Sequence, residues 1–350
     1  MAKDKDVRRR FLSGLALALA VALPGTACAA GPSTPAGNAP VDGTWQEIVA
    51  AAEKEGEVTM YSSQGTDQLE DLKARFEKKH PKIKLTLVRG TDADLTPKVE
   101  AERKTGKGIA DLFIGASLVW IKANKDAYEA PRGPAFGAPA YRKATSVPDG
   151  SYFLTNAAIL TFGWNTKLYK TGLKDYPDLL DPKLADGKIG VVKPAAPSFV
   201  DFYLYLKETY GADFVKKLGA QRPRIYPSSL PLAQALTSGE IAAAAFVQPL
   251  VDEKKAGAPV EWGLAKKAWG ALFWGMALKS APHPNAAQVL ADFMVTEEGQ
   301  QAIARKNSSV LPGIEGAVGD TGNVRRQDLS QLTPEKVRAY QAEWNEQFGA

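Results

Sequence analysis

The chain has 350 residues, 45% of them hydrophobic and 24% charged, which is typical of globular proteins and excludes a disordered or fibrous chain. Lys and Arg number 44 against 39 Asp and Glu, but the first 30 residues hold five basic and two acidic ones, so the remainder carries only +2. No basic stripe with interleaved aromatic residues is present, which argues against a nucleic-acid partner. Two histidines and one cysteine exclude a His/Cys zinc site and an internal disulfide.

We expect residues 1–29 to be an export signal. Three arginines at 8–10 precede an apolar run over 12–23, which is shorter than the roughly twenty residues that span a bilayer. The arginines followed by Phe11 and Leu12 resemble a twin-arginine signal, and an ordinary Sec signal is the alternative. The sequence therefore predicts an exported protein without a membrane span, either periplasmic or anchored at the cell surface.

Cys28 has two interpretations. It is either the lipid-modified first residue of a lipoprotein or part of a small-residue cleavage site that is removed with the signal. Residues 30–43 are rich in Ala, Gly, Pro, Ser and Thr and are predicted to form a flexible linker. In both cases the folded body contains no cysteine.

From Trp45 onward the hydrophobic periodicity alternates between strands and helices. The first series predicts strands over 57–61, 82–88 and 109–116, with helices over 67–79, from Thr96-Pro97 and from 118. The second series predicts strands over 188–193, 224–227 and 241–247, with helices over 198–210 and 230–237. Further strands are expected over 157–164 and 271–278, and further helices over 285–293, 297–306 and 333–348. This alternation indicates an α/β fold of mostly parallel sheets flanked by helices.

Hydroxyl side chains recur where a predicted strand ends and a helix begins. Taken singly, each is typical of a helix cap. Ligands of parallel α/β sheets, however, bind beyond the carboxyl ends of the strands, where free helix N–H groups attract anions. Such joints, together with neighbouring polar and aromatic residues, supply the candidate ligand-binding residues Ser62, Ser63, Gln64, Thr91, Ser117, Ser198, Phe199, Ser228, Ser229 and Gln248.

Catalytic machinery is not expected. No Gly-x-Ser-x-Gly elbow and no phosphate-loop signature occurs in the sequence. His80 and His283 lie in predicted turns and are interpreted as surface residues. We therefore predict no catalytic residue, no metal site and no cofactor.

Several stretches, in their order and spacing, resemble the extracellular solute-binding proteins of ABC importers, in the branch that includes ferric-iron binders. The resemblance extends from about Glu55 to Pro312, and each stretch alone is weakly specific. The stretches are VTMYSSQG (58–65), ADLFIGA (110–116), WNTKL (164–168), LLDPK (179–183), YPSS (226–229), SGE (238–240), GAPV (257–260), APHPNAA (281–287) and TEEGQ (296–300).

The resemblance implies a type II, two-lobe fold whose lobes close on a ligand. Residues 44–156 plus 274–350 would form lobe 1, residues 157–273 would form lobe 2, and two crossover strands would join them. It also implies a monomer that delivers a small solute to a membrane permease. A membrane sensor as the partner, and an exported enzyme on the same fold, are the alternatives.

The chain departs from the iron binders at one position. These usually carry adjacent tyrosines after the strand that corresponds to 241–247, where this chain has Gln248-Pro249. Without these phenolates the resemblance implies an anion-bearing solute, such as a phosphonate, a phosphate ester or a carboxylate. A protein that binds ferric iron or an iron chelate is the alternative.

Overall fold

The computed structural model describes residues 40–349, apart from the side chains of residues 143 and 144. The predicted export signal, Cys28 and most of the predicted linker lie outside the described residues. Within the described part, no helix is long and apolar enough to cross a membrane.

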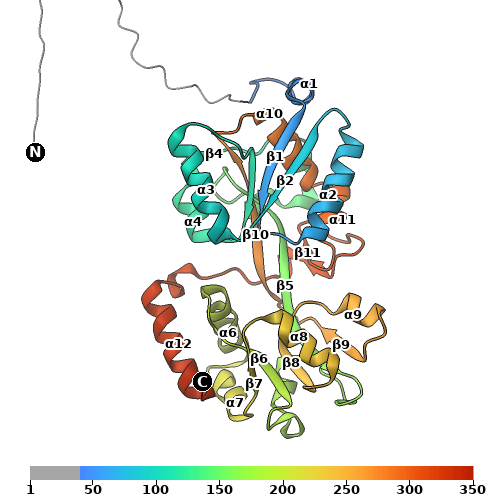
Figure 1. The fold of residues 1–350 in the computed structure, drawn as a ribbon, viewed down its shortest axis with the longest axis vertical. Helices are drawn as coiled ribbons and strands as arrows, with labels where there is room; N and C mark the ends of the chain where they lie inside the picture. The colour runs from blue at the N-terminus through green and yellow to red at the C-terminus, as the bar shows by residue number, and fades with distance from the viewer. Residues whose placement is uncertain (1–39, 350) are drawn as a thin grey trace, which may run out of the picture. The chain divides into compact units, whose positions relative to one another are not determined.

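The first sheet combines parallel strands with one antiparallel neighbour, in the order β2-β1-β3-β10 (Figure 1). Its parallel strands are β1 (Glu57–Ser62), β2 (Lys84–Arg89) and β3 (Leu112–Gly115), and β10 (Trp269–Leu278) runs antiparallel to β3. The helices of this part are α1 (Trp45–Glu55), α2 (Thr66–Lys79), α3 (Asp92–Thr105), α4 (Leu118–Ala123), α5 (Lys143–Ser146), α10 (Pro284–Met294) and α11 (Glu297–Ile303). Short strands β4 (Tyr128–Glu129), β11 (Ser308–Ser309) and β12 (Gly319–Asp320) extend it.

The second sheet repeats this arrangement. Strands β6 (Ile189–Val192), β7 (Arg224–Tyr226) and β8 (Ala243–Val247) are parallel, while β9 (Val260–Gly263) pairs antiparallel with β5 (Phe153–Asn165). Its helices are α6 (Pro197–Tyr210), α7 (Phe214–Ala220), α8 (Ser229–Ser238), α9 (Val251–Lys255) and α12 (Pro334–Phe348).

Strands β5 and β10 run through both parts. β5 pairs with β10 and β11 in the first sheet and with β8 and β9 in the second. The predicted crossover strands at 157–164 and 271–278 are therefore confirmed, and the α/β fold with them. The sheets are mixed rather than mostly parallel, because each takes a crossover strand as an antiparallel neighbour of its parallel strands.

Two separate hydrophobic cores lie under these sheets, and we define lobe 1 and lobe 2 by them. The first core includes Met60, Leu112 and Met276, and the second includes Val191, Phe202 and Phe246. Helix α12 differs from the expectation that residues 274–350 lie in lobe 1, because Val337, Tyr340 and Trp344 belong to the second core. The apolar face of this helix was visible in the sequence, but the surface that receives it was not.

Helix α3 begins earlier than predicted. Its first residue is Asp92 rather than a residue near Thr96, and Pro97 lies inside the helix. Thr91 caps it: its hydroxyl accepts from the Asp94 N–H, and the Asp94 carboxylate accepts from the Thr91 N–H at 3.1 Å and from the Thr91 hydroxyl at 2.7 Å. This reciprocal capping box fixes the start of the helix more strongly than a Thr-Pro pair.

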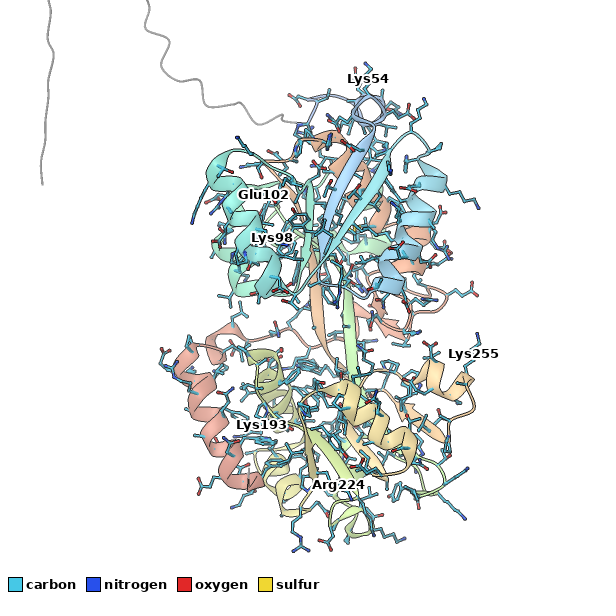
Figure 2. The ribbon with its side chains drawn as sticks, in the orientation of Figure 1. Lys54, Lys98, Glu102, Lys193, Arg224 and Lys255 are labelled. Carbon is cyan, nitrogen blue, oxygen red and sulfur yellow. The ribbon has the colours of Figure 1, made fainter. Side chains whose placement is uncertain are left out.

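Glu102 of the same helix, labelled in Figure 2, is a buried carboxylate. Glu102 is 9% exposed and accepts hydrogen bonds from the Tyr61 hydroxyl at 2.8 Å and from the backbone N–H of Ile109 at 2.8 Å. Burial, together with this bond to a carboxylate, raises the pKa of Tyr61 to about 12. The contacts fasten α3 to β1 and to the segment before β3.

The two histidines are only partly exposed, and each makes contacts that its predicted surface turn did not suggest. The His283 side chain is 22% exposed, and its Nδ1 lies 3.1 Å from Oδ2 of the fully buried Asp111. His80 packs its ring 5.1 Å from that of Phe76 and 6.2 Å from that of Phe293, and burial lowers its pKa. The contact of His80 with Phe76 is local to α2, whereas Phe293 and Asp111 are distant in the sequence from the histidines they contact, so those two contacts could not be anticipated.

We expect stability to depend on pH through Asp292 of α10. This side chain is 7% exposed, and burial raises its pKa to about 6 although the Ala135 N–H donates to it at 2.8 Å. Because the folded state then holds the proton more tightly than the unfolded state, ionisation should destabilise the fold as pH rises from about 4 to 7. Urea unfolding across this pH range should show a smaller fall in the unfolding free energy for Asp292→Asn than for the wild type. An equal loss in the variant and the wild type would contradict the assignment.

Candidate functional site

A pocket of about 440 Å³ lies beside the crossover strands, and we call it the interlobe pocket. Lobe 1 contributes the turn after β1, the end of β2 and the loop after α11, and lobe 2 contributes the residues after β8. The lining residues are Ser63, Gln64, Gly65, Thr66, Asp67, Gln68, Arg89, Ala158, Gln248, Pro249, Phe273, Arg305, Lys306 and Asn307. The position agrees with the expectation that ligands of parallel sheets bind beyond the strand carboxyl ends.

The start of α2 faces this pocket without a side-chain cap. Gly65 is the N-cap residue and makes no capping hydrogen bond through a side chain. The first N–H groups of the 14-residue helix therefore stay available, and together with the helix dipole they favour an anion. Asp67 in the first turn is exposed and adds one negative charge to the lining.

Three cationic side chains line the interlobe pocket. Arg305 is half-buried, and its Nε is shielded from solvent and has no hydrogen-bond partner in the part of the chain that the structure describes. Arg89 donates through Nε to the Gln64 carbonyl at 3.3 Å, and Lys306 pairs with Asp252 of α9 in the other lobe. Lys306 also has a left-handed backbone with φ 62°, which is costly for a residue with a Cβ atom. The lining thus carries an excess of positive charge.

Of the predicted site residues, Ser63, Gln64 and Gln248 line the pocket. The Ser63 hydroxyl oxygen is buried and has no partner among residues 40–349, so it is available to a ligand. Gln64 is buried, and its amide donates to the Asn156 side chain of β5 at 2.5 Å, which ties β1 to the crossover strand. Ser62 lies outside the pocket lining: it is fully buried, and its hydroxyl accepts from the Gln64 N–H at 3.2 Å.

The remaining predicted residues lie outside the pocket lining and stay predictions as ligand contacts. Thr91 is occupied by its capping box, and Ser117 is the N-cap residue of α4. Ser228 and Ser229 lie at the start of α8 and Ser198 in the first turn of α6. Phe199 packs its ring 5.1 Å from that of Phe246.

Sequence reasoning missed Arg305 and Lys306. They lie at the C-terminal end of the helix predicted over 297–306, where basic residues need no further explanation because they complement the helix dipole. Helix α11 in fact ends at Ile303, which leaves both residues in the following loop. Arg305 and Lys306 line the same pocket as Ser63 because of long-range packing, which no local sequence pattern predicts.

The chemistry of the pocket suits an anion better than a bare metal cation. Among the described residues, no group of three or more His, Cys, Asp and Glu side chains is placed to hold a metal ion. The pocket lining includes no tyrosine and a single carboxylate, that of Asp67. Hard cations require several anionic oxygens, whereas guanidinium, ammonium and N–H groups bind oxyanions.

Comparison with known families agrees with this architecture. The family described as bacterial extracellular solute-binding protein matches residues 71–325. The chain belongs to this family. It is accordingly a solute-binding component of an ABC transporter and not an enzyme, which agrees with the prediction from the sequence. No curated protein matches this solute-binding protein in sequence.

Solved structures confirm the type II fold. Iron-bound HitA from Pseudomonas aeruginosa is 18% identical, with a TM-score of 0.63 over 82% of this chain and 99% of HitA. AfuA from Actinobacillus pleuropneumoniae, with fructose-6-phosphate bound, is 21% identical, with a TM-score of 0.58 over 84% of this chain and 99% of AfuA. The Trichodesmium protein FutA, with iron and citrate, is 18% identical, with a TM-score of 0.58 over 84% of this chain and 98% of FutA. Such low identities show the fold and not the ligand.

Proposed function

We propose that this solute-binding protein captures a small solute with an anionic oxygen group, such as a phosphonate, a phosphate ester or a carboxylate. The observation that carries the proposal is the positive lining of the interlobe pocket at the uncapped start of α2. Delivery to a membrane permease follows from the family, and export of the mature chain to the periplasm or the cell surface is part of the proposal.

The pocket offers three kinds of donor to an oxyanion. The guanidinium of Arg305 supplies paired N–H groups, the first turn of α2 supplies backbone N–H groups, and Ser63 supplies an unpartnered hydroxyl. Gln248 approaches from lobe 2, so a ligand held by all four would contact both lobes. We propose that this shared contact favours closure of the lobes about β5 and β10.

An anionic ferric chelate is the second candidate. Iron binders recur among the similar structures, including the FutA complex with iron and citrate. The described residues of the pocket lack the anionic ligands that bare ferric iron requires, but a chelate presents its own carboxylates to Arg305 and Lys306. Iron would then be carried as part of an anion, which the same lining accommodates.

A ligand screen separates these candidates. The protein is first examined by native mass spectrometry and then by thermal unfolding with a phosphonate, fructose 6-phosphate, citrate, ferric citrate and ferric chloride. A ligand at 100 times its dissociation constant should stabilise the fold by about 2.7 kcal/mol. Stabilisation by an organic anion without iron supports the first candidate, and stabilisation by ferric citrate but not by citrate supports the second. Stabilisation by ferric chloride alone would overturn both.

The unpartnered hydroxyl of Ser63 provides a residue-level test. Ser63→Ala should weaken binding of the screened ligand by about 1–3 kcal/mol, because the ligand loses a buried donor. Ser151 is a matched control, since its hydroxyl is also buried without a partner but lies outside the pocket lining. Isothermal titration should therefore give an unchanged affinity for Ser151→Ala. Equal affinities for both variants would remove Ser63 from the site.

A further inference from the structure

A second, larger cavity lies on the segment that leads from lobe 1 to α12. It has a volume of about 740 Å³ and shares no lining residue with the interlobe pocket. Arg142 and Thr321 of lobe 1 line it, as do Lys267, just before β10, and Arg325 and Arg326 of the connecting segment. In Figure 1 this segment is the red chain that runs into α12. We call this cavity the connector cavity.

Two of its four cations already have carboxylate partners. Arg142 donates to Asp320 at 2.5 and 3.2 Å. Arg325 is 7% exposed and donates to Asp201 at 2.8 Å and to Glu208 at 2.7 Å. These ion pairs hold the guanidinium groups in place and fix the geometry of the cavity wall.

The other two cations have no carboxylate partner among the described residues. Arg326 lies over the Trp274 ring, with Cζ 5.9 Å from the ring centroid, and Lys267 makes no ion pair through its ammonium group. Both Arg326 and Lys267 are exposed, so a ligand can reach them from solvent. Asp328 is the lining carboxylate not bound to a cation, and it accepts from the Ser330 hydroxyl at 2.7 Å.

Buried hydroxyl groups complete the wall. Ser146 and Thr321 are each 2% exposed and line the cavity. In the described part of the chain, neither side-chain hydroxyl has a hydrogen-bond partner. Neither oxygen is among the buried, unpartnered oxygens of the described residues, so both hydroxyls reach solvent. Beside two cations without a carboxylate partner, they can donate to an acceptor in the cavity.

We propose that the connector cavity binds a small oxyanion of the phosphate type, either free phosphate or a phosphate group of a larger solute. Four oxygens arranged around one centre match a site with a guanidinium fork, an ammonium group and hydroxyl donors approaching from different walls. Because the donors come from both lobes and from their connection, the bound anion touches all three. This site is independent of the ligand that occupies the interlobe pocket.

Phosphate binding to the connector cavity is tested in a chain whose interlobe pocket has been weakened by a substitution. The full chain carrying Arg305→Gln is titrated with inorganic phosphate by calorimetry, at constant ionic strength maintained with chloride. We expect saturable binding whose dissociation constant rises at least tenfold when Arg326→Gln and Lys267→Gln are added. Adding Arg338→Gln to the Arg305→Gln chain removes a charge from the exposed surface of α12 and should leave the dissociation constant for phosphate unchanged. An unchanged constant in the Arg326→Gln/Lys267→Gln chain, or no binding before those changes, overturns the proposal.

Two further arms check the chemistry and the fold. Acetate at the same ionic strength should bind at least tenfold more weakly than phosphate, and equal binding would contradict the phosphate-type assignment. Arg326→Lys keeps the charge but loses the planar fork, so its affinity should fall between the wild type and Arg326→Gln. Urea unfolding of each variant without phosphate shows whether the variant is folded. If the Arg326→Gln/Lys267→Gln chain is unfolded, the phosphate affinity of the milder Arg326→Lys variant decides whether Arg326 binds the anion.

Discussion

Arg305→Gln should lower the affinity of the interlobe pocket for its anionic ligand by about 10- to 100-fold. Hydrogen bonds to charged groups contribute about 1.5–3 kcal/mol, and each 1.4 kcal/mol is a factor of ten in the dissociation constant. Arg305 is suited to this role because its Nε is buried without a partner among the described residues. The ligand identified in the screen is titrated by calorimetry into the wild type and the variant.

Stability separates a binding role from a structural one. Since Arg305 makes no side-chain ion pair in the described structure, removing its charge should leave the unfolding free energy within about 0.5 kcal/mol of the wild type. Arg338→Gln on α12 is the charge-matched control and should leave the affinity unchanged. If Arg305→Gln unfolds readily but binds with normal affinity, Arg305 is a structural residue and the pocket assignment fails.

Asp201→Asn should destabilise the protein by about 3–5 kcal/mol, the range seen when one partner of a buried ion pair is neutralised. Asp201 is 1% exposed, and its carboxylate accepts from Arg325 at 2.8 Å and from the Trp269 indole N–H at 2.7 Å. The asparagine keeps the shape but leaves the buried guanidinium with Glu208 alone. Urea unfolding at neutral pH measures the loss.

An exposed ion pair provides the matched control. Asp186 pairs with Arg222 at the surface, where the side chains are 61% and 77% exposed. Solvent screens such a pair, so Asp186→Asn should change stability by no more than about 1 kcal/mol. Similar losses of unfolding free energy for Asp201→Asn and Asp186→Asn would show that the burial of Asp201 does not make its ion pair more stabilising than an exposed one. A large loss confined to Asp201→Asn would show that the connection between β10, α6 and the segment before α12 depends on this pair.

Local patterns predicted most of the elements, because periodicity and capping act over a few residues. Helix α6 begins at Pro197, one residue before its prediction, and β10 contains the apolar stretch expected at 271–278. The exceptions had competing local signals. Thr96-Pro97 looked like a helix start, but the capping box of Thr91 and Asp94 begins the helix earlier. Arg305 and Lys306 looked like the end of a helix that stops at Ile303.

Long-range packing explains what the patterns did not predict. The amphipathic face of α12 does not by itself name its partner. Helices α6 and α7 receive it in lobe 2, with Trp344 5.6 Å from Tyr203 of α6 between ring centroids. His283 occupies a turn by its local sequence, yet Asp111 on another segment accepts from its backbone N–H at 2.7 Å. Such partners are distant in the chain and leave no local trace.

The sequence by itself determined the class of this protein. The alternation of strands and helices, two apolar crossover stretches and a family resemblance along the chain were sufficient for a two-lobe solute-binding protein, because each depends on short-range patterns or on their order. The tertiary structure alone decided which charges meet. Residues 63, 89, 248 and 305 line one pocket only because β5 and β10 bring the two sheets together, and the positive character of that pocket arises from this juxtaposition.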